Sequence, residues 1–119
     1  MTITSVATFT MRAGRESDAL ALIRAVKRQA LDEQPGTLVY LVHRVLDEQG
    51  RPTRRLYFYE RYRNEAALRA HLASTSWQRV VEKWTDCFEG KSARAAIEFF
   101  GVKRIAAFER VGSIPIAPR

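Results

Sequence analysis

Glu60 and His71 are the residues of this sequence best suited to acid–base chemistry. The run from Leu56 to Tyr62 alternates with a period of two, so a β-strand here places Glu60 on one face together with Phe58 and Tyr62. A carboxylate on an otherwise apolar face needs a hydrogen-bond donor or a cavity open to water or ligand. Histidine titrates close to neutral pH, so His71 is the candidate base and Glu60 the group that orients its imidazole.

The elements around these two residues bring them toward one space. Asn64 is a suitable N-cap for a helix over Glu65–Leu72, and helical spacing puts His71 on the same side as Ala67, Leu68 and Leu72. Only Arg63 separates the strand from this cap, so the helix must fold back onto the strand. We therefore expect Glu60 and His71 to line one hollow between the sheet and the helices.

The rest of the chain supplies the other strands and helices of a small α+β domain. Ser76 is expected to cap a further helix, and Gly101 to introduce a last strand. The segment Lys91–Phe100 is read either as a short helix or as an irregular cover. The remaining expectations are a strand over Ile3–Arg12, a helix over Glu16–Gln34, a hairpin of Thr37–Leu46 with Arg54–Tyr62, a helix with an apolar core stripe of Trp77, Val80, Val81, Trp84 and Phe88, and a final strand over Val102–Val111.

This order predicts the split βαβ arrangement of ferredoxin-like folds, a four-stranded antiparallel sheet with its helices on one face. The uncovered face includes Tyr57 and Tyr59, and a second copy of the chain is expected to bury it, giving a homodimer and a dimeric α+β barrel. Residues 1–112 form the single domain and residues 113–119 a C-terminal tail.

Composition excludes several other classes of protein. The 119 residues fit one domain, and no apolar run is long enough to span a bilayer, so no membrane association is expected and the location is expected to be cytoplasmic. Cys87 stands alone and gives neither a disulfide nor a metal-ligand pair. The net charge of +7 is spread over every element, which makes nucleic acid an unlikely partner. His43 is read as a packed or surface histidine.

The residues around Glu60 also resemble a known family. Glu60, Tyr62, the Glu65–Leu68 helix start, His71, Ser74 and Trp77 match the pattern E-x-[YW]-x-x-x-x-A-[LF]-x-x-H-x-x-[ST]-x-x-[FW]. This pattern is similar to that of antibiotic biosynthesis monooxygenase domains, which are dimeric α+β barrels and include cofactor-free oxygenases of quinols and anthrones.

The resemblance implies a cofactor-independent monooxygenase that acts on a phenolic, quinol or polyketide-like aromatic molecule with molecular oxygen. In this reading His71 removes the phenolic proton, and either Glu60 orients the imidazole or Tyr62 and Arg44 stabilise the resulting anion. No metal site and no cofactor are expected. The substrate-binding residues would be Phe58, Tyr62, Trp77, Trp84 and Arg44.

Three alternatives stay open at this stage. Glu60 and His71 can equally be a buried polar pair that holds the helix on the sheet. The same pocket can belong to a non-catalytic small-molecule-binding dimer. Haem binding or degradation is the third, because a related branch of the superfamily does this; here, however, His71 stands where that branch has a tryptophan, and Val81 where its iron-ligating histidine stands.

Overall fold

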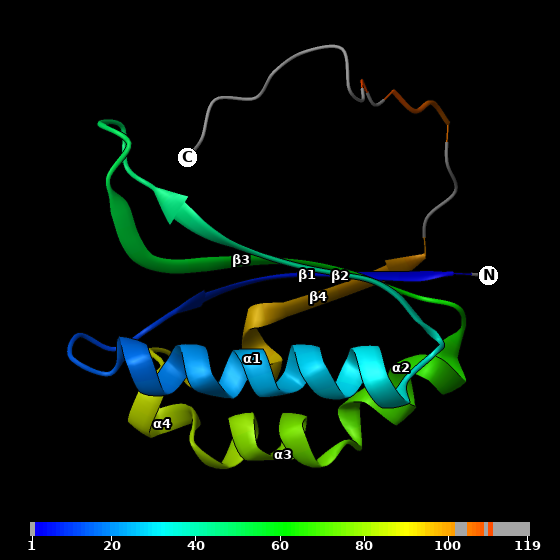
Figure 1. Ribbon diagram of the computed structural model, residues 1–119, viewed down its shortest axis with the longest axis horizontal. Helices are drawn as coiled ribbons and strands as arrows, with labels where there is room; N and C mark the ends of the chain where they lie inside the picture. The colour runs from blue at the N-terminus through cyan, green and yellow to red at the C-terminus, as the bar shows by residue number, and fades with distance from the viewer. Residues whose placement is uncertain (1, 102–104, 109, 111–119) are drawn as a thin grey trace.

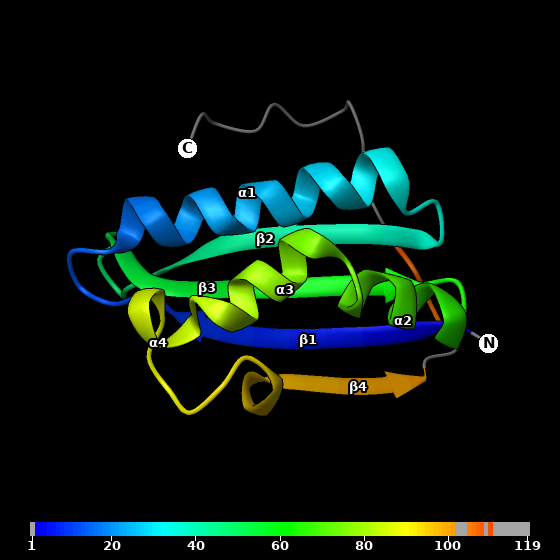
Figure 2. The same ribbon diagram turned by 90° about the horizontal axis from the view of Figure 1, so that it is seen from below.

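The protein consists of two layers, a four-stranded antiparallel sheet and a layer of helices that covers one of its faces (Figure 1). The computed structural model describes residues 2–101, 105–108 and 110. The strand order is β2-β3-β1-β4, as the view through the helices shows (Figure 2). The elements are β1 (Ile3–Thr10), α1 (Glu16–Glu33), β2 (Thr37–Leu46), β3 (Pro52–Tyr62), α2 (Glu65–Leu72), α3 (Thr75–Glu82), α4 (Trp84–Cys87), a 3₁₀ turn (Arg94–Ala96) and β4 (Ile97–Gly101). The predicted ferredoxin-like α+β class is confirmed.

The alternation that predicted strand β3 also determines its buried face. Leu56, Phe58 and Tyr62 are almost fully buried under the helices, whereas Tyr57 on the opposite face is 41% exposed. Aromatic side chains from the two layers then meet in the core. Phe9 of β1 packs against Phe58 at a centroid separation of 4.5 Å and against the edge of Trp84 at 4.8 Å.

The start of α3 differs from the sequence-based expectation. Ser74, not Ser76, is the N-cap, and its side chain accepts a hydrogen bond from the Trp77 backbone N–H at 3.3 Å. The helical run is also broken at Lys83, after which α4 begins. Val81, within α3, is 47% exposed, so its assignment to the core stripe was wrong, while Val80 next to it is fully buried.

The fourth strand lies earlier in the chain than predicted. Ile97–Gly101 pairs antiparallel with β1, with Ala7 opposite Ile97 and Ile3 opposite Gly101. The expected strand over 102–111 is not formed by residues 105–108 or 110, and its other positions lie outside the described residues. The glycine predicted to precede the strand instead ends it. The proposed tail, residues 113–119, also lies outside the described residues.

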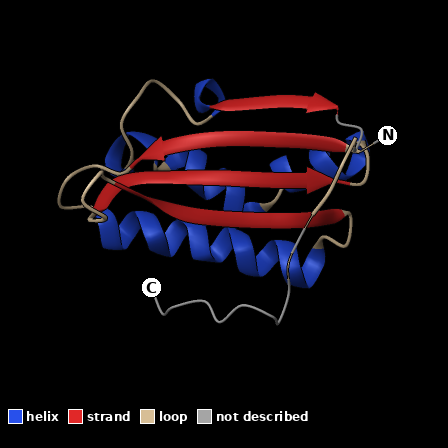
Figure 3. Ribbon diagram, turned by 90° about the horizontal axis from the view of Figure 1, so that it is seen from above, coloured by secondary structure: helices blue, strands red, loops and turns tan. Residues whose placement is uncertain are grey.

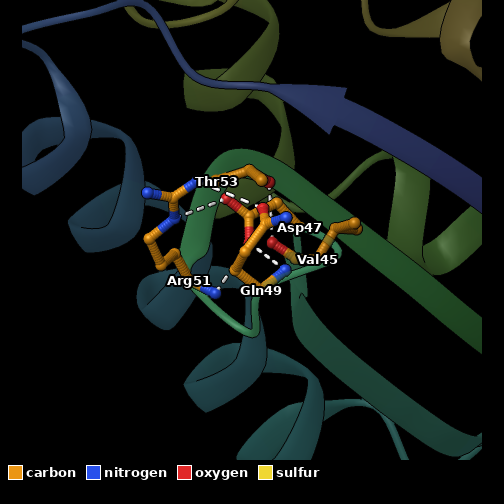
Figure 4. A network of polar contacts seen from close by, with 5 residues as sticks. All are labelled: Val45, Asp47, Gln49, Arg51 and Thr53. Carbon is orange, nitrogen blue, oxygen red and sulfur yellow. Dashed lines mark hydrogen bonds and ion pairs between the residues drawn. The ribbon is translucent and has the colours of Figure 1, made fainter.

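The turn between β2 and β3 is organised by Asp47 (Figure 4). Its Oδ1 accepts hydrogen bonds from the backbone N–H groups of Gln49 and Arg51, both at 2.9 Å, and its Oδ2 accepts one from the Arg51 guanidinium at 3.0 Å. These contacts, the Arg51 backbone bond foremost, lower the pKa of Asp47. Gly50 adopts a φ of 78°, a left-handed conformation that suits glycine and closes the hairpin.

The sheet face opposite the helices is uncovered in the single chain, and residues 105–108 pass on this side (Figure 1). The strand register places Leu41 beside Tyr59 and His43 beside Tyr57 on this open face. Leu41 is 46% exposed there.

Within the described residues, none of the helices has the length and hydropathy needed to cross a membrane.

Candidate functional site

His71 is buried at the junction of α2 with the end of α1 and the start of β2. Only 2% of the residue is exposed, and its Nδ1 lies 2.8 Å from Oε1 of Gln34, the residue that follows α1. An amide oxygen only accepts hydrogen bonds, so Nδ1 carries the proton and donates it. The neutral imidazole therefore presents its unprotonated Nε2 to the interior.

Close packing of α2 on the β2 start holds His71 in this place. Asn64 caps α2 through its side chain, which accepts from the Ala67 backbone N–H at 2.9 Å. A Cβ built on Gly36 would lie 2.5 Å from the Ala67 Cβ, so the close approach of the two segments needs a glycine at this position. The Arg63 N–H also donates to the Gly36 carbonyl oxygen at 2.8 Å, which ties the end of β3 to the same corner.

Glu60 faces His71 from strand β3, as the alternation of that strand predicted. Its Oε1 lies 3.6 Å from Nε2 of His71, and it also accepts a hydrogen bond from the hydroxyl of Tyr62. The Glu60 side chain is 12% exposed and the His71 side chain 3%. The carboxyl and the imidazole thus share one interior space, with the phenol beside them.

This space, which we call the His71 hollow, is apolar and almost filled. Its volume is about 10 Å³, which is room for a single water molecule at most and not for an aromatic ring. The Tyr62 ring lies 5.4 Å from the imidazole, and the rings of Tyr40 and Trp77 lie 6.1 Å from it. The hollow is lined by Ser5, Ala7, Phe9, Tyr40, Phe58, Glu60, Tyr62, His71, Leu72, Trp77, Ile97 and Phe99.

Burial shifts the pKa values of the acid and the base of the hollow in opposite directions. Loss of solvent raises the pKa of Glu60 to about 7, against a smaller lowering by the Tyr62 hydrogen bond. The same loss of solvent lowers the pKa of His71 to about 4. Burial, followed by the nearby Glu60 charge, raises the pKa of Tyr62 and of Tyr40. At neutral pH the imidazole is therefore neutral, and Glu60 is the group that gains or loses a proton.

Replacement of Glu60 with glutamine is expected to stabilise the fold at alkaline pH. The folded-state pKa of Glu60, about 7, exceeds its ordinary value of 4.5, so its contribution to stability is complete below pH 4.5 and is lost as the pH rises through 7. That loss amounts to about 3 kcal/mol. The advantage of Glu60→Gln over the wild type, measured by urea unfolding, should grow by this amount between pH 4.5 and pH 8.

Glu48→Gln, at an exposed position in the hairpin, is the control for the change in net charge. If the free energy of unfolding of both variants, relative to the wild type, rises equally with pH, burial of Glu60 is not the cause of the increase. A Glu60→Gln advantage that shrinks with rising pH would contradict the direction of the pKa shift.

Two residues predicted for substrate binding lie outside the His71 hollow. Arg44 belongs to edge strand β2, opposite Leu56, where it is exposed and its Nη1 donates to the Thr53 carbonyl oxygen at 3.3 Å. Trp84 packs against Phe9 and donates its indole N–H to the Gly90 carbonyl oxygen at 3.1 Å. The alternation of side chains along β2 predicts the face on which Arg44 lies, but not its distance from Glu60. Trp84 is the first residue of α4, after the break at Lys83, and so does not continue α3.

Two polar neighbours of His71, Tyr40 and Gln34, were absent from the sequence-based assignment. Tyr40 has the strand parity that directs it toward the helices, so alternation in β2 could have identified it. Gln34 ends a helix far from His71 in sequence, and no local pattern marks it. The other histidine, His43, lies exposed on β2 and makes no contact with the hollow.

A surface groove of about 320 Å³ adjoins the hollow, and we call it the α3 groove. It runs between α3, α4 and the segment that precedes β4. Leu72, Trp77 and Ile97 line both the groove and the hollow, so these side chains are the wall between them. The other lining residues are Gln78, Val81, Trp84, Thr85, Lys91, Ser92, Ala93 and Arg94.

In the described part of the chain, no three His, Cys, Asp or Glu side chains lie close enough to hold a metal ion.

Comparison by sequence gives one family match: a model described as antibiotic biosynthesis monooxygenase covers residues 2–83, more than half of the chain. No protein of curated function matches the sequence.

Several solved structures share the fold at low sequence identity. A protein of Mycobacterium tuberculosis is 20% identical, with a TM-score of 0.72 over 90% of this chain and 100% of that chain. A Pseudomonas aeruginosa protein is 21% identical, with a TM-score of 0.67 over 88% and 95% of the two chains. A conserved protein of Methanosarcina mazei is 16% identical, with a TM-score of 0.70 over 87% and 94%. Similarity at this level extends to the fold alone.

Proposed function

Because the chain belongs to the antibiotic biosynthesis monooxygenase family, we propose that it is a cofactor-independent monooxygenase of phenolic, quinol or polyketide-like aromatic molecules. The observation that carries this proposal is the close approach of Glu60 and His71, whose Oε1 and Nε2 atoms lie 3.6 Å apart in a buried space walled by aromatic rings. A base in such a site meets a flat apolar substrate without competition from water.

The pair acts as one proton acceptor. The pKa of Glu60, about 7, suits proton uptake near neutral pH better than that of His71, about 4, so the carboxylate takes the proton that the sequence analysis assigned to the imidazole. His71 then accepts a hydrogen bond from the protonated acid through Nε2. Gln34 is a positioning residue, since its amide oxygen keeps the proton of His71 on Nδ1.

The reaction balances without an added reductant. Proton loss to Glu60 gives an electron-rich anion that transfers one electron to oxygen. The resulting radical and superoxide combine to a peroxide anion, which takes the proton back from Glu60 and becomes a hydroperoxide. Loss of water then leaves a carbonyl on the ring, so one oxygen atom enters the product and the other leaves as water. The substrate carbon gives up two hydrogens and supplies all four electrons that reduce the oxygen molecule.

The substrate enters from the α3 groove. The His71 hollow, at about 10 Å³, admits no ring while Leu72, Trp77 and Ile97 close it. The groove is within the volume range of small-molecule sites, and its lining includes the aromatic side chains of Trp77 and Trp84. Displacement of the Trp77 side chain opens the hollow to the bound ring.

We further propose that the protein works as a homodimer through its open sheet face. Leu41 and Tyr57 are each more than 40% exposed on β2 and β3, on the sheet face that a single chain leaves uncovered. A second copy that packs on this face buries these side chains and leaves the α3 groove, on the helix side, accessible.

Oxygen uptake with a panel of quinols and anthrones tests the activity. We expect uptake by protein purified in the presence of a chelator, with one atom of isotopically labelled oxygen incorporated into the product. A second candidate function, non-catalytic binding of a small aromatic molecule, is favoured by the closed state of the hollow. Quenching of tryptophan fluorescence by the panel without oxygen uptake would support that candidate and reject the oxygenase.

A further inference from the structure

We propose that a groove between α1 and edge strand β2 binds an organic anion with an apolar aryl or acyl body. This α1 groove is lined by Leu20, Ile23, Arg24, Ala25, Lys27, Arg28, Leu31, Asp32, Val42, His43, Arg44 and Leu56. It shares none of these residues with the His71 hollow or the α3 groove, so the proposal is independent of the oxygenase activity.

The groove arises because α1 lies along the border of the sheet. Figures 2 and 3 both show α1 running beside β2 and extending past the sheet border. Since β2 is the edge strand, no further strand of the described chain fills the space under the helix. The resulting volume of about 890 Å³ exceeds that of the α3 groove and is within the range of small-molecule sites.

The floor of the α1 groove is apolar. Ile23 and Leu56 are buried beneath it, and Leu20 and Val42 are partly buried at its sides. Leu31, at one end, is 73% exposed. A ligand that fills this space gains by covering these side chains, so it must carry an apolar body as well as any charge.

The rim of the groove is strongly basic. Arg24, Lys27 and Arg28 project from one side of α1 and Arg44 from β2, against the single carboxylate of Asp32. In the described chain no ion pair involves these four cations, whereas Arg15, Arg51, Arg54 and Arg69 each pair with a carboxylate. Guanidinium and ammonium groups left without carboxylates around an apolar floor suit a carboxylate, sulfonate or phosphate group on the ligand.

Other occupants fit the groove less well. Residues 102–119 of a second copy carry Lys103, Arg104, Arg110 and Arg119 against Glu109, so their charge repels the basic rim. A single-stranded nucleic acid would need exposed aromatic faces for its bases, but the lining residues include no Phe, Tyr or Trp. An amphipathic small anion satisfies both the floor and the rim.

Two fluorescent probes with nearly the same aromatic body test the proposal. Anilinonaphthalene sulfonate is an anion, and phenylnaphthylamine is its uncharged counterpart. We expect the sulfonate to bind the wild type. The protein's NMR amide signals that shift on binding should be those of residues 20–31 and 42–44. The double variant Arg24→Gln/Lys27→Gln should weaken sulfonate binding about tenfold or more and leave the neutral probe within about twofold.

The double variant Arg69→Gln/Arg79→Gln removes the same charge from exposed positions on α2 and α3, and it should bind the sulfonate as the wild type does. Equal weakening by both double variants, or shifts centred on the open sheet face, would overturn the proposal. Displacement of the sulfonate by inorganic phosphate alone at matched ionic strength would also overturn it, because the site would then recognise only the ion. Displacement by naphthoate or by decanoate, but not by decanol, supports it and identifies an aryl or an acyl body.

Discussion

Replacement of His71 with asparagine is expected to lower oxygen consumption by about 100-fold or more while the protein stays folded. Asparagine can place its amide N–H near the position of Nδ1 and keep the hydrogen bond to Gln34, which in the wild type measures 2.8 Å. It has no counterpart of Nε2, the atom that lies 3.6 Å from Oε1 of Glu60, so the proposed acceptor for the protonated acid is lost. The measurement is the initial rate of oxygen uptake with the best substrate of the quinol and anthrone panel.

Glu60→Gln should lose activity to a similar extent, because the amide cannot accept the substrate proton. Arg69→Gln, two residues before His71 on the exposed side of α2, is the control and should retain the wild-type rate. Both site variants must show wild-type circular dichroism for the comparison to hold. Full activity in a folded His71→Asn protein would mean that His71 has only a structural role in the hollow.

Replacement of Leu41 with glutamate is expected to convert the proposed dimer into a monomer. Size exclusion with light scattering should give the wild type a mass of about twice 13.6 kDa. Leu41 is 46% exposed in the single chain and lies on the open face beside Tyr59. Burial of a glutamate without a partner in the proposed interface is costly enough to raise the dissociation constant by about 100-fold or more.

Val81→Glu is a matched control, because Val81 is 47% exposed but lies on α3, on the other side of the sheet. This variant should remain a dimer. A wild type of single-chain mass would refute the dimer outright, and a Val81→Glu monomer with a Leu41→Glu dimer would place the interface on the helices instead of the open face.

The sequence alone determined the strands and helices whose apolar periodicity is strong. Helix α2 and strand β2 have the predicted bounds, and β3 buries the predicted side. The prediction that Glu60 and His71 share one space followed from the same local rules, since one short connection leaves α2 little freedom over β3. Weak or competing local signals failed: Ser74 and Ser76 are both good caps, and the segment before Gly101 carried both helical and strand-forming residues.

The tertiary structure was needed for the distances within the site. Gln34 reaches His71 because α1 ends where α2 packs against Gly36, and no periodicity relates positions so far apart in sequence. Strand alternation and helical spacing were both compatible with Arg44 and Trp84 lying near Glu60. In the structure Arg44 lies at the edge of the sheet, and Trp84 begins α4 after the break at Lys83. The closed hollow is set by the joint packing of Leu72, Trp77 and Ile97 from three separate elements. Periodicity gives the direction of a side chain, but the space around it depends on how distant segments pack together.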